Sequence, residues 1–400
     1  MAWDEEFESA TKPGPGRRIV GAVVIAADAS GLFANSRLVQ QPTDTQVGNI
    51  VHHDAKGFTS VDPETAKPMS EDTTFWIASC TKLLTTICAL QNVEQGKLVL
   101  DDDVSEILPE WKSPDILTGW DHGQPQFRKA TKKITLRQLL THSSGMGYDF
   151  LSPELAKWRE WRGEAVRPGG GEITKQYFAP LLYEPGENWA YSVSIDWAGK
   201  MVERVNGGIS LGEYMKQNIF DPLGMTSTGF RPERNENISR NLCPTTKRTP
   251  EGNLVPTDPY AIQNPKDDLG GGGLYSAAPD YVRVLISLLR NDGKLLRPET
   301  VKSMFTPQLS DDSHLRATVG EPLAGPMFRA GVNSAAWNFG LGGILNMEDV
   351  DGVCKKGTLT WGGLPNLFWI IPPGDAESMA LAVAYRKISL QKALHKAKVA

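Results

Sequence analysis

Three Ser-x-x-Lys patterns stand out in the sequence, because this spacing can place a serine nucleophile beside a basic amine. On an α-helix, residues three positions apart share a face, so the hydroxyl and the amine can meet across one turn. The three matches are Ser9/Lys12, Ser79/Lys82 and Ser389/Lys392. The first precedes a Pro-Gly-Pro-Gly break that ends any helix, and the third lies in a charged segment whose lysines we expect to be solvated. Context therefore favours the second pair.

Ser79 and Lys82 begin an apolar segment that predicts a helix ending near Gly96. The backbone N–H groups in the first turn of a helix have no partner within it, so that of Ser79 could donate to a developing oxyanion. The positive end of the helix dipole and the apolar surroundings both disfavour the protonated form of Lys82. A neutral amine beside a serine suits nucleophilic catalysis. Taken alone, the pair would more often be a capping serine and a lysine whose stem packs on the core.

Two further segments offer the other groups that such a reaction needs. Tyr191 follows a sharp turn and directly precedes a predicted helix, so it could relay a proton, although an isolated tyrosine is more often a core aromatic. The segment "TLTWGGLPN" ends a predicted strand in Gly362 and Gly363. Two glycines let a substrate approach the backbone closely, and the N–H of Leu364 could then be a second oxyanion donor.

The composition is that of an ordinary globular protein. The 400 residues include 40% hydrophobic and 22% charged residues, and the net charge is -5. An acidic chain with only short basic clusters is not suited to nucleic acids, so we expect no nucleic-acid partner. The N-terminus is acidic, and the apolar run "IVGAVVIAA" that follows is too short to span a bilayer. We therefore expect no membrane association and a cytoplasmic location.

Other chemistries find little support in the sequence. The four cysteines are scattered, with no CxxC spacing and no paired histidines, so we expect neither a metal site nor a cofactor. The Gly-rich segment "DLGGGGLYS" lacks the GK[ST] ending of a phosphate-binding loop. His142 has no aspartate clearly placed to orient it. A structural histidine is therefore expected there rather than a member of a Ser-His-Asp triad.

Predicted strands lie at both ends of the chain, with mostly helical segments between them. The strand segments are "RIVGAVVIAAD", "GLFANS", "TTFWIA", "GTLTW", "NLFWIIPP" and "SMALAVAY". This order predicts an α/β (α+β) protein with a mixed, mainly antiparallel sheet that is built from both chain ends and flanked by helices, with an inserted helical region. We expect an α/β domain from residues 1–100 and 231–400, a mainly helical domain from 101–230, and the active site in the cleft between them.

Several longer motifs resemble, in their order along the chain, those of the serine β-lactamase/penicillin-binding-protein superfamily. They are "IASCTKLLTTICALQNVEQGKLVLDDDVSEILPEW", "ITLRQLLTHSSGM", "YEPGENWAYSVS", "NIFDPLGM", "GGGGLYSAAPDYVRVL" and "FGLGGIL". The resemblance is to its class C β-lactamase-like esterases and transesterases, and it extends from about Gly21 to Tyr385. Within that branch, "LTWGGLPN" and "IDWAGK" are similar to the fungal lovastatin-type polyketide acyltransferases. The resemblance implies a β-lactamase-like fold.

The resemblance also implies a role for each residue of these motifs. Ser79 matches the nucleophile, Lys82 the general base and Tyr191 the tyrosine that relays protons. The backbone N–H groups of Ser79 and Leu364 would hold the oxyanion. The positions that match substrate-binding residues are Tyr148, Trp361, Gly362 and Gly363.

Two departures from the superfamily pattern change the substrate that the resemblance implies. Trp361 stands where β-lactamases carry the lysine that pairs with a penicillin carboxylate, and Val193 stands where they carry the asparagine that binds its amide. Without the cation and the amide clamp, a β-lactam has little to hold it. We therefore expect ester or thioester chemistry.

The resulting hypothesis is a serine acyltransferase or esterase. Ser79 would take an acyl group from an ester or an acyl thioester, which coenzyme A or a carrier protein could bear. It would pass this group to a hydroxyl of a small-molecule acceptor that resembles a secondary metabolite. Hydrolysis of small esters and a non-catalytic protein that has kept the fold are the alternatives. The sequence leaves the oligomeric state and the acceptor pocket open.

Overall fold

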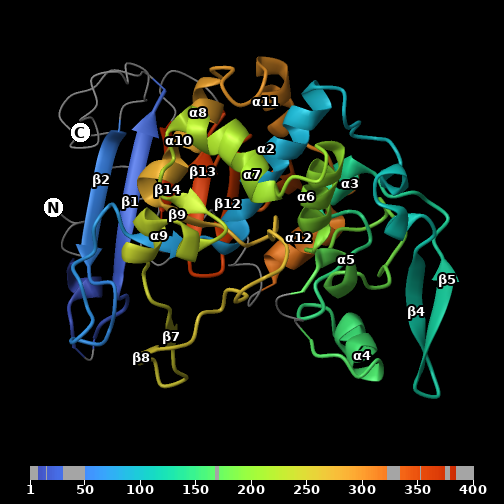
Figure 1. Cartoon of the computed structure of the whole chain (residues 1–400), viewed down its shortest axis with the longest axis horizontal. Helices are drawn as coiled ribbons and strands as arrows, with labels where there is room; N and C mark the ends of the chain where they lie inside the picture. Colours follow the sequence, from blue (N-terminus) through green and yellow to red (C-terminus); the bar gives the residue numbers. More distant parts are fainter. Residues whose placement is uncertain are drawn as a thin grey trace.

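The computed structural model describes residues 8–14, 16–29, 50–166, 171–321, 334–351, 353–373 and 379–383. Within them, the largest sheet has seven antiparallel strands in the order β10-β11-β12-β13-β14-β1-β2 (Figure 1). They are β1 (Gly21–Asp28), β2 (Ile50–Gly57), β10 (Trp337–Phe339), β11 (Ile344–Asn346), β12 (Leu359–Gly363), β13 (Leu367–Ile371) and β14 (Met379–Val383). Because β1 pairs with β14, with Val24 opposite Val383, the sheet is built from both ends of the chain as predicted.

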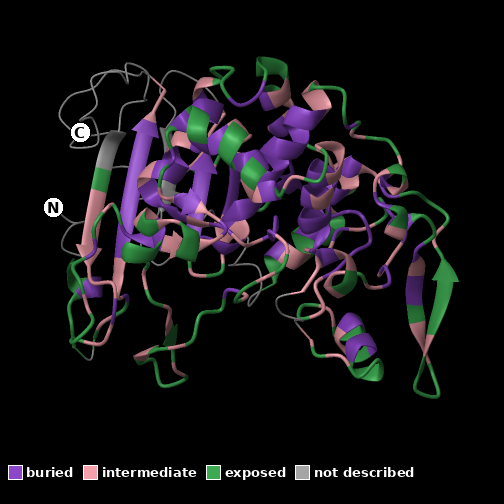
Figure 2. Ribbon diagram, in the orientation of Figure 1, coloured by how far each residue is buried: buried purple, intermediate pink, exposed green. Residues whose placement is uncertain are grey.

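The central strands are buried on both faces, which explains their continuous apolar sequences. Residues 22–27 of β1 and all of β13 are buried (Figure 2). The amphipathic helix α10 (Ala278–Arg290) packs its apolar side against β1, β13 and β14. The strand expected at residues 31–36 and the helix expected at residues 389–400 lie outside the described residues.

Helix α2 (Thr81–Glu94) is the buried helix that the sequence predicted after Ser79. A single 3-10 turn, η1 (Ala78–Cys80), leads into it, and its residues from Thr81 to Asn92 are all buried. It packs against α6 (Ser194–Val205). The helix ends at Glu94 with Gln95 as its C-cap, and Gly96 follows with a φ of +70°, the left-handed conformation that favours glycine after a helix. A helix that is buried all round has little tolerance for polar side chains without partners.

The middle of the chain is mostly helical, as expected, but it also contains a hairpin that the sequence analysis missed. Strands β4 (Asp115–Asp121) and β5 (Gln124–Lys129) pair across a His122-Gly123 turn in which both residues have positive φ. The other elements there are η2 (Val104–Glu106), η3 (Pro109–Trp111), α3 (Leu136–Leu140), α4 (Pro153–Trp161), α5 (Ile173–Gln176), α7 (Leu211–Met215), the π-helical η4 (Lys216–Phe220) and α8 (Asp221–Leu223). The hairpin is largely exposed, so no apolar alternation marks it in the sequence.

A smaller sheet carries the chain into α2 and α10. Its order is β3-β9-β6, and β3 leads to η1 while β9 leads to α10. The three strands are β3 (Thr74–Trp76), β6 (Thr228–Gly229) and β9 (Tyr275–Ala277). The remaining elements are η5 (Pro232–Arg234), α9 (Glu236–Arg240), β7 (Thr246–Arg248), β8 (Leu254–Pro256), α11 (Pro298–Met304) and α12 (Ser313–Gly320). The division into two domains stays a prediction.

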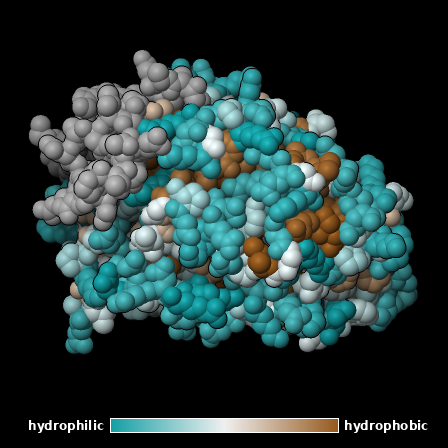
Figure 3. Space-filling view, turned by 45° about the horizontal axis from the view of Figure 1, so that its top comes forward, coloured by the Kyte–Doolittle hydropathy of each residue, from teal (hydrophilic) through white to brown (hydrophobic). Residues whose placement is uncertain are grey.

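The surface drawn in Figure 3 is mostly hydrophilic, with separate apolar areas. Among the described residues, no helix combines the length and the apolar character that crossing a bilayer requires. In the same part of the chain, no group of three or more His, Cys, Asp or Glu side chains is placed to hold a metal ion.

The packing of α2 gives a prediction about stability. Replacing Ile87, which is fully buried, with alanine leaves a cavity in the core and should lower the free energy of unfolding by about 2–5 kcal/mol. Val99→Ala is the matched control, because Val99 is 52% exposed and should change that free energy by less than about 0.5 kcal/mol. Thermal unfolding followed by circular dichroism measures both. Equal melting temperatures for the two variants would contradict the central place of α2.

Candidate active site

Ser79 and Lys82 meet where β3 turns into α2. Ser79 lies in η1 and Lys82 in the first turn of α2, and Lys82 Nζ is 3.2 Å from Ser79 Oγ. The two side chains therefore share one face, as their spacing predicted. Ala78, directly before the serine, has a φ of +44°. A non-glycine residue pays energy for this left-handed conformation, which is retained most often at functional sites.

The amine of Lys82 is buried and has three polar partners. The residue is 2% exposed, and Nζ contacts Ser79 Oγ, Tyr148 OH at 3.1 Å and the carbonyl oxygen of Gly271 at 2.5 Å. It also lies 4.7 Å from the centre of the Tyr191 ring. Burying an amine without partners would be costly. These groups therefore explain how a lysine occupies an otherwise apolar helix.

Tyr191 reaches the same serine from the segment before α6. Its hydroxyl donates to Ser79 Oγ over 2.5 Å. His142 packs edge-on against the Tyr191 ring at 4.8 Å, and its Nδ1 lies 3.0 Å from Ser192 Oγ. Burial, together with the positive charge of Lys82, holds the pKa of His142 well below its usual range. His142 is therefore a neutral packing residue, as the sequence indicated.

The Gly-rich loop (residues 268–276) wraps around the start of α2. Thr85 Oγ1 donates to the carbonyl oxygen of Gly270 over 2.8 Å, and Lys82 Nζ donates to that of Gly271. Both donors lie on the same side of α2, because they are three residues apart. The loop thus supplies backbone carbonyl acceptors to the active-site helix. A phosphate-binding loop would instead present backbone N–H groups to a ligand.

Sequence analysis missed Asp196, a buried carboxylate on α6. It is 2% exposed, and its Oδ1 accepts a hydrogen bond of 2.8 Å from the N–H of Gly271. Burial raises the pKa of Asp196 to about 6, although Lys82 and the Gly271 N–H favour its charged form. The available signal was an aspartate between Ile195 and Trp197 on a helix, since both neighbours are core residues.

The end of β12 packs directly against η1. A Cβ atom on Gly363 would lie 2.4 Å from the carbonyl oxygen of Ile77 and 3.4 Å from Cys80 Sγ. Only glycine permits this approach, which brings the backbone of Leu364 to the turn that carries Ser79. The close neighbour of Gly363 is thus the backbone of Ile77 in the same chain. The expected approach of a substrate to the two glycines stays a prediction.

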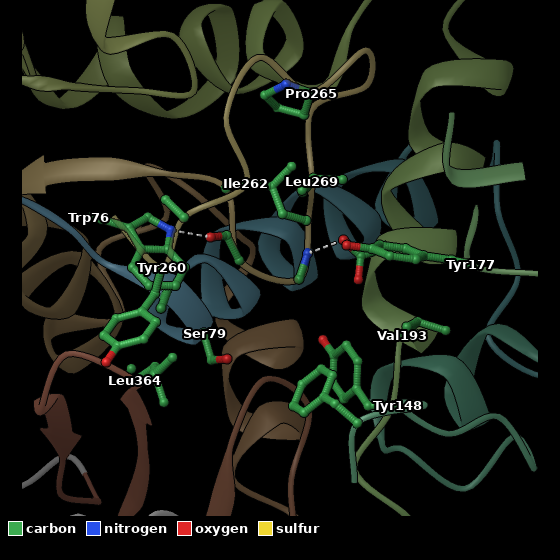
Figure 4. A pocket seen from close by; sticks show the side chains of 18 of the residues that line it. Trp76, Ser79, Tyr148, Tyr177, Val193, Tyr260, Ile262, Pro265, Leu269 and Leu364 are labelled. Atoms are coloured by element: carbon green, nitrogen blue, oxygen red, sulfur yellow. Dashed lines mark hydrogen bonds between the residues drawn. The ribbon is translucent and has the colours of Figure 1, made fainter. Parts of the chain in front are cut away.

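One cavity of about 300 Å³ lies beside these groups, and Lys82 is not among the residues that line it. Ser79, Tyr148 and Leu364 extend into it from different parts of the chain (Figure 4). Its wall is rich in aromatic and aliphatic side chains, and Trp361 and Val193 are buried parts of that wall. Of the predicted site residues, the cavity is lined by Ser79, Tyr148, Tyr191, Trp361, Gly362, Gly363 and Leu364.

Competing serines lie elsewhere. Ser9 is exposed at the start of the described chain, and the pair Ser389/Lys392 lies outside the described residues. Ser210 occurs in a G-I-S-L-G segment, but its side chain caps α7 by accepting a hydrogen bond from the N–H of Glu213. Its hydroxyl is thus engaged in holding a helix terminus.

The family of the chain follows from comparison with known proteins. A family model described as Beta-lactamase matches residues 17–387, a span that includes every part of the site. The chain belongs to the Beta-lactamase family. It is 39% identical over 385 residues to the lovastatin esterase of Penicillium rubens, covering 92% of this chain and 88% of that protein. It is 37% identical over 368 residues to the monacolin J acid methylbutanoyltransferase of Aspergillus terreus, covering 89% of this chain and 84% of that protein.

A solved structure agrees with this assignment over the whole fold. Unliganded simvastatin synthase from Aspergillus terreus superimposes with a TM-score of 0.83 at 32% sequence identity, covering 99% of this chain and 96% of that chain. The Beta-lactamase-like fold predicted from the sequence is confirmed. Like these relatives, this member of the family is an enzyme, a β-lactamase-like serine acyltransferase or esterase.

The close approach at Gly363 gives a test of the site geometry. In Gly363→Ala the added methyl group meets the carbonyl oxygen of Ile77, so β12 must move away from η1. A displacement of about 1 Å can cost roughly a hundredfold in rate, and we expect a loss of that order in the hydrolysis of a p-nitrophenyl ester.

Gly320→Ala is the matched control for this experiment. A Cβ atom on Gly320 has open space around it, so this variant should keep the wild-type rate. Wild-type activity in Gly363→Ala would show that the packing of β12 on η1 does not position the reacting groups.

Proposed function

We propose that the chain is a serine acyltransferase that forms an acyl-enzyme on Ser79 and passes the acyl group to a hydroxyl of a small-molecule acceptor. One observation carries this proposal. Ser79 Oγ contacts both the buried amine of Lys82 and the hydroxyl of Tyr191. Two groups able to move protons therefore flank one hydroxyl at the wall of a cavity, as nucleophilic catalysis by serine requires.

In the first step, Lys82 accepts the proton of Ser79. A neutral amine has two N–H donors and one lone pair, which matches donation to the carbonyl of Gly271 and the hydroxyl of Tyr148 with the lone pair toward Ser79. Ser79 Oγ then bonds to the carbonyl carbon of the donor, and the electron pair of the C=O moves to its oxygen. The N–H groups of Ser79 and Leu364 hold this oxyanion.

Collapse of the tetrahedral intermediate breaks the bond to the leaving alcohol or thiol. The proton held by Lys82 reaches that leaving group through Tyr191. In the second step the acceptor oxygen attacks the acyl-enzyme as its proton passes to Tyr191, and Tyr191 gives its own proton to Ser79 Oγ, to which its hydroxyl donates a hydrogen bond. The bond between Ser79 Oγ and the acyl carbon breaks at the same time, which frees Ser79 and releases the new ester. Atoms and protons therefore balance over the two half-reactions, and no cofactor takes part.

The wall of the cavity supports ester or acyl thioester donors. Trp361 and Val193 offer an incoming ligand neither a cation nor an amide, so they give no clamp for the carboxylate and amide of a β-lactam. Coenzyme A or a carrier protein in the cytoplasm would supply the thioester. Tyr148, Trp361 and the two glycines of β12 would contact the substrate, in a cleft between the expected α/β and helical domains.

Hydrolysis of the acyl-enzyme is the second candidate function, and the names of two similar proteins support it as an alternative to transfer. One similar protein is called an esterase and another a methylbutanoyltransferase. Both outcomes share the acyl-enzyme and differ only in whether water or an alcohol attacks it. A polyketide alcohol acceptor is proposed on the same basis.

The acyl-enzyme is tested by mass spectrometry of the intact protein. After mixing with a short acyl thioester or a p-nitrophenyl ester, the wild-type mass should increase by one acyl group. Ser79→Ala should show no such increase, because it lacks the nucleophile. Ser9→Ala is the matched control from the other described Ser-x-x-Lys pattern, and it should acylate like the wild type. An adduct that persists in Ser79→Ala would overturn the mechanism.

A chase experiment separates transfer from hydrolysis. The acylated protein is divided between buffer alone and buffer with monacolin J acid, the compound in the name of one relative. Transfer predicts faster loss of the acyl group with the alcohol and a new ester in the product mixture. Equal loss in both samples, with only free acid released, would make the chain an esterase.

A further inference from the structure

Asp196 is a buried carboxylate that the steps above do not use. It lies on α6 and lines the cavity, and its Oδ1 accepts a hydrogen bond from the N–H of Gly271. The carbonyl oxygen of the same glycine accepts the hydrogen bond from Lys82 Nζ. Side chains from two helices thus hold Gly271 from its two ends, one by a carboxylate and one by an amine.

The loop has almost no freedom at this point. The peptide unit that donates to Asp196 is also held by its carbonyl, which belongs to Gly270 and accepts from Thr85 Oγ1 over 2.8 Å. A Cβ atom on Gly271 would lie only 2.3 Å from the carboxylate. Asp196 therefore fixes the backbone acceptor that orients Lys82.

The carboxylate also faces the positive charge that Lys82 gains when it takes the proton of Ser79. Among the described residues, that charge acts on the buried groups Cys80, His142 and Asp196, and only the last is a carboxylic acid. In the part of the chain that the structure describes, the two charges are joined through Gly271 rather than by a direct ion pair.

Other charged groups near Asp196 are already paired. On α6 itself, Lys200 bonds to Glu203 and Asp267. From α4, Arg159 lines the same cavity and bonds to Asp149 and to Glu164. Arg231, which also lines the cavity, bonds to Asp268. The hydroxyls of Tyr148 and Tyr191 contact Lys82 and Ser79. The other titratable residues on the cavity wall are Tyr177, Glu233, Tyr260 and Tyr275.

We propose that Asp196 is a positioning residue, whose ionised carboxylate fixes Gly271 and stabilises the ammonium group that forms on Lys82. The proposal rests on the function proposed above, in which the proton of Ser79 Oγ moves to Lys82 Nζ. No bond to Asp196 forms or breaks, and no proton is transferred to it. Its charge lowers the energy of a cation that appears in a buried site, where the interaction of charges is stronger than in water.

A pH dependence follows from this role. Burial raises the pKa of Asp196 to about 6, so the carboxyl is neutral below that pH and ionised above it. If the ionised form assists acylation, the acylation rate rises with pH as Asp196 loses its proton. The free energy of unfolding changes in the opposite direction. Because the pKa of Asp196 is higher in the folded than in the unfolded chain, this free energy falls as pH rises toward the folded-state pKa.

The experiment separates the charge of Asp196 from its hydrogen bond. Single-turnover acylation by a p-nitrophenyl ester is followed on both sides of pH 6, the approximate pKa of Asp196. Asp196→Asn keeps an acceptor for Gly271 but removes the charge. Above that pH it should acylate roughly ten- to a hundredfold more slowly, and the rise with pH should disappear.

Thr85→Val is the matched control. It removes the other hydrogen bond to the same peptide unit and leaves the carboxylate in place. Its rate should keep the wild-type rise with pH, whatever the size of its loss. Asp196→Glu, which retains the charge, should recover part of the rise.

Three results would overturn the proposal. The first is a wild-type acylation rate that does not change through this pH range. The second is an Asp196→Asn variant whose rate depends on pH as in the wild type. The third is an equal loss of acylation rate in Asp196→Asn and Thr85→Val, with the rise with pH kept in both. Circular dichroism checks folding, and if Asp196→Asn does not fold, the wild-type and Asp196→Glu profiles decide. Failure of the proposed function is distinct, because wild-type protein would then form no acyl-enzyme at all.

Discussion

The structure depends on one constraint, the burial of an amine inside an apolar helix. Lys82 occupies a position in α2 that packing alone would give to a hydrophobic residue. Its partners come from three places: the turn η1 before its own helix, the segment after α3 and the Gly-rich loop. Each of these segments must therefore hold its backbone to within a hydrogen-bond length. The sheet, with α10 packed against it, is the rigid frame that makes this possible.

The same arrangement governs which substrates can enter. Ser79 and Tyr191 bring hydroxyl groups to the cavity, while aromatic and aliphatic side chains form much of its wall. Such a wall favours the binding of apolar acyl groups and acceptors, because binding removes their apolar surface from water. It makes few directional contacts with them. The similar proteins are named for different reactions, one as a lovastatin esterase and the other as a monacolin J acid methylbutanoyltransferase.

Sequence reasoning succeeded where local geometry decides the outcome. The Ser79–Lys82 contact follows from helical spacing, and β12, β13 and β14 lie where apolar runs predicted strands. Tyr191 and Gly363 needed the resemblance to known motifs, since nothing local shows that they meet Ser79. Asp196 was missed because its importance comes from Gly271, which lies far from it in the chain. The β4–β5 hairpin was missed because it is largely exposed and its turn lacks the common Asn-Gly or Asp-Gly pair.

The pairing of β1 with β14 has a consequence for how the protein is made. Strand β1 is synthesised early, but its neighbour β14 is not available until nearly all of the remaining sequence has left the ribosome. Contacts this distant in sequence are slow to form, and until then β1 can pair only with β2, which leaves one apolar edge open. Nascent chains of this enzyme are therefore exposed to aggregation for most of their synthesis, and chaperones that cover strand edges should improve its yield.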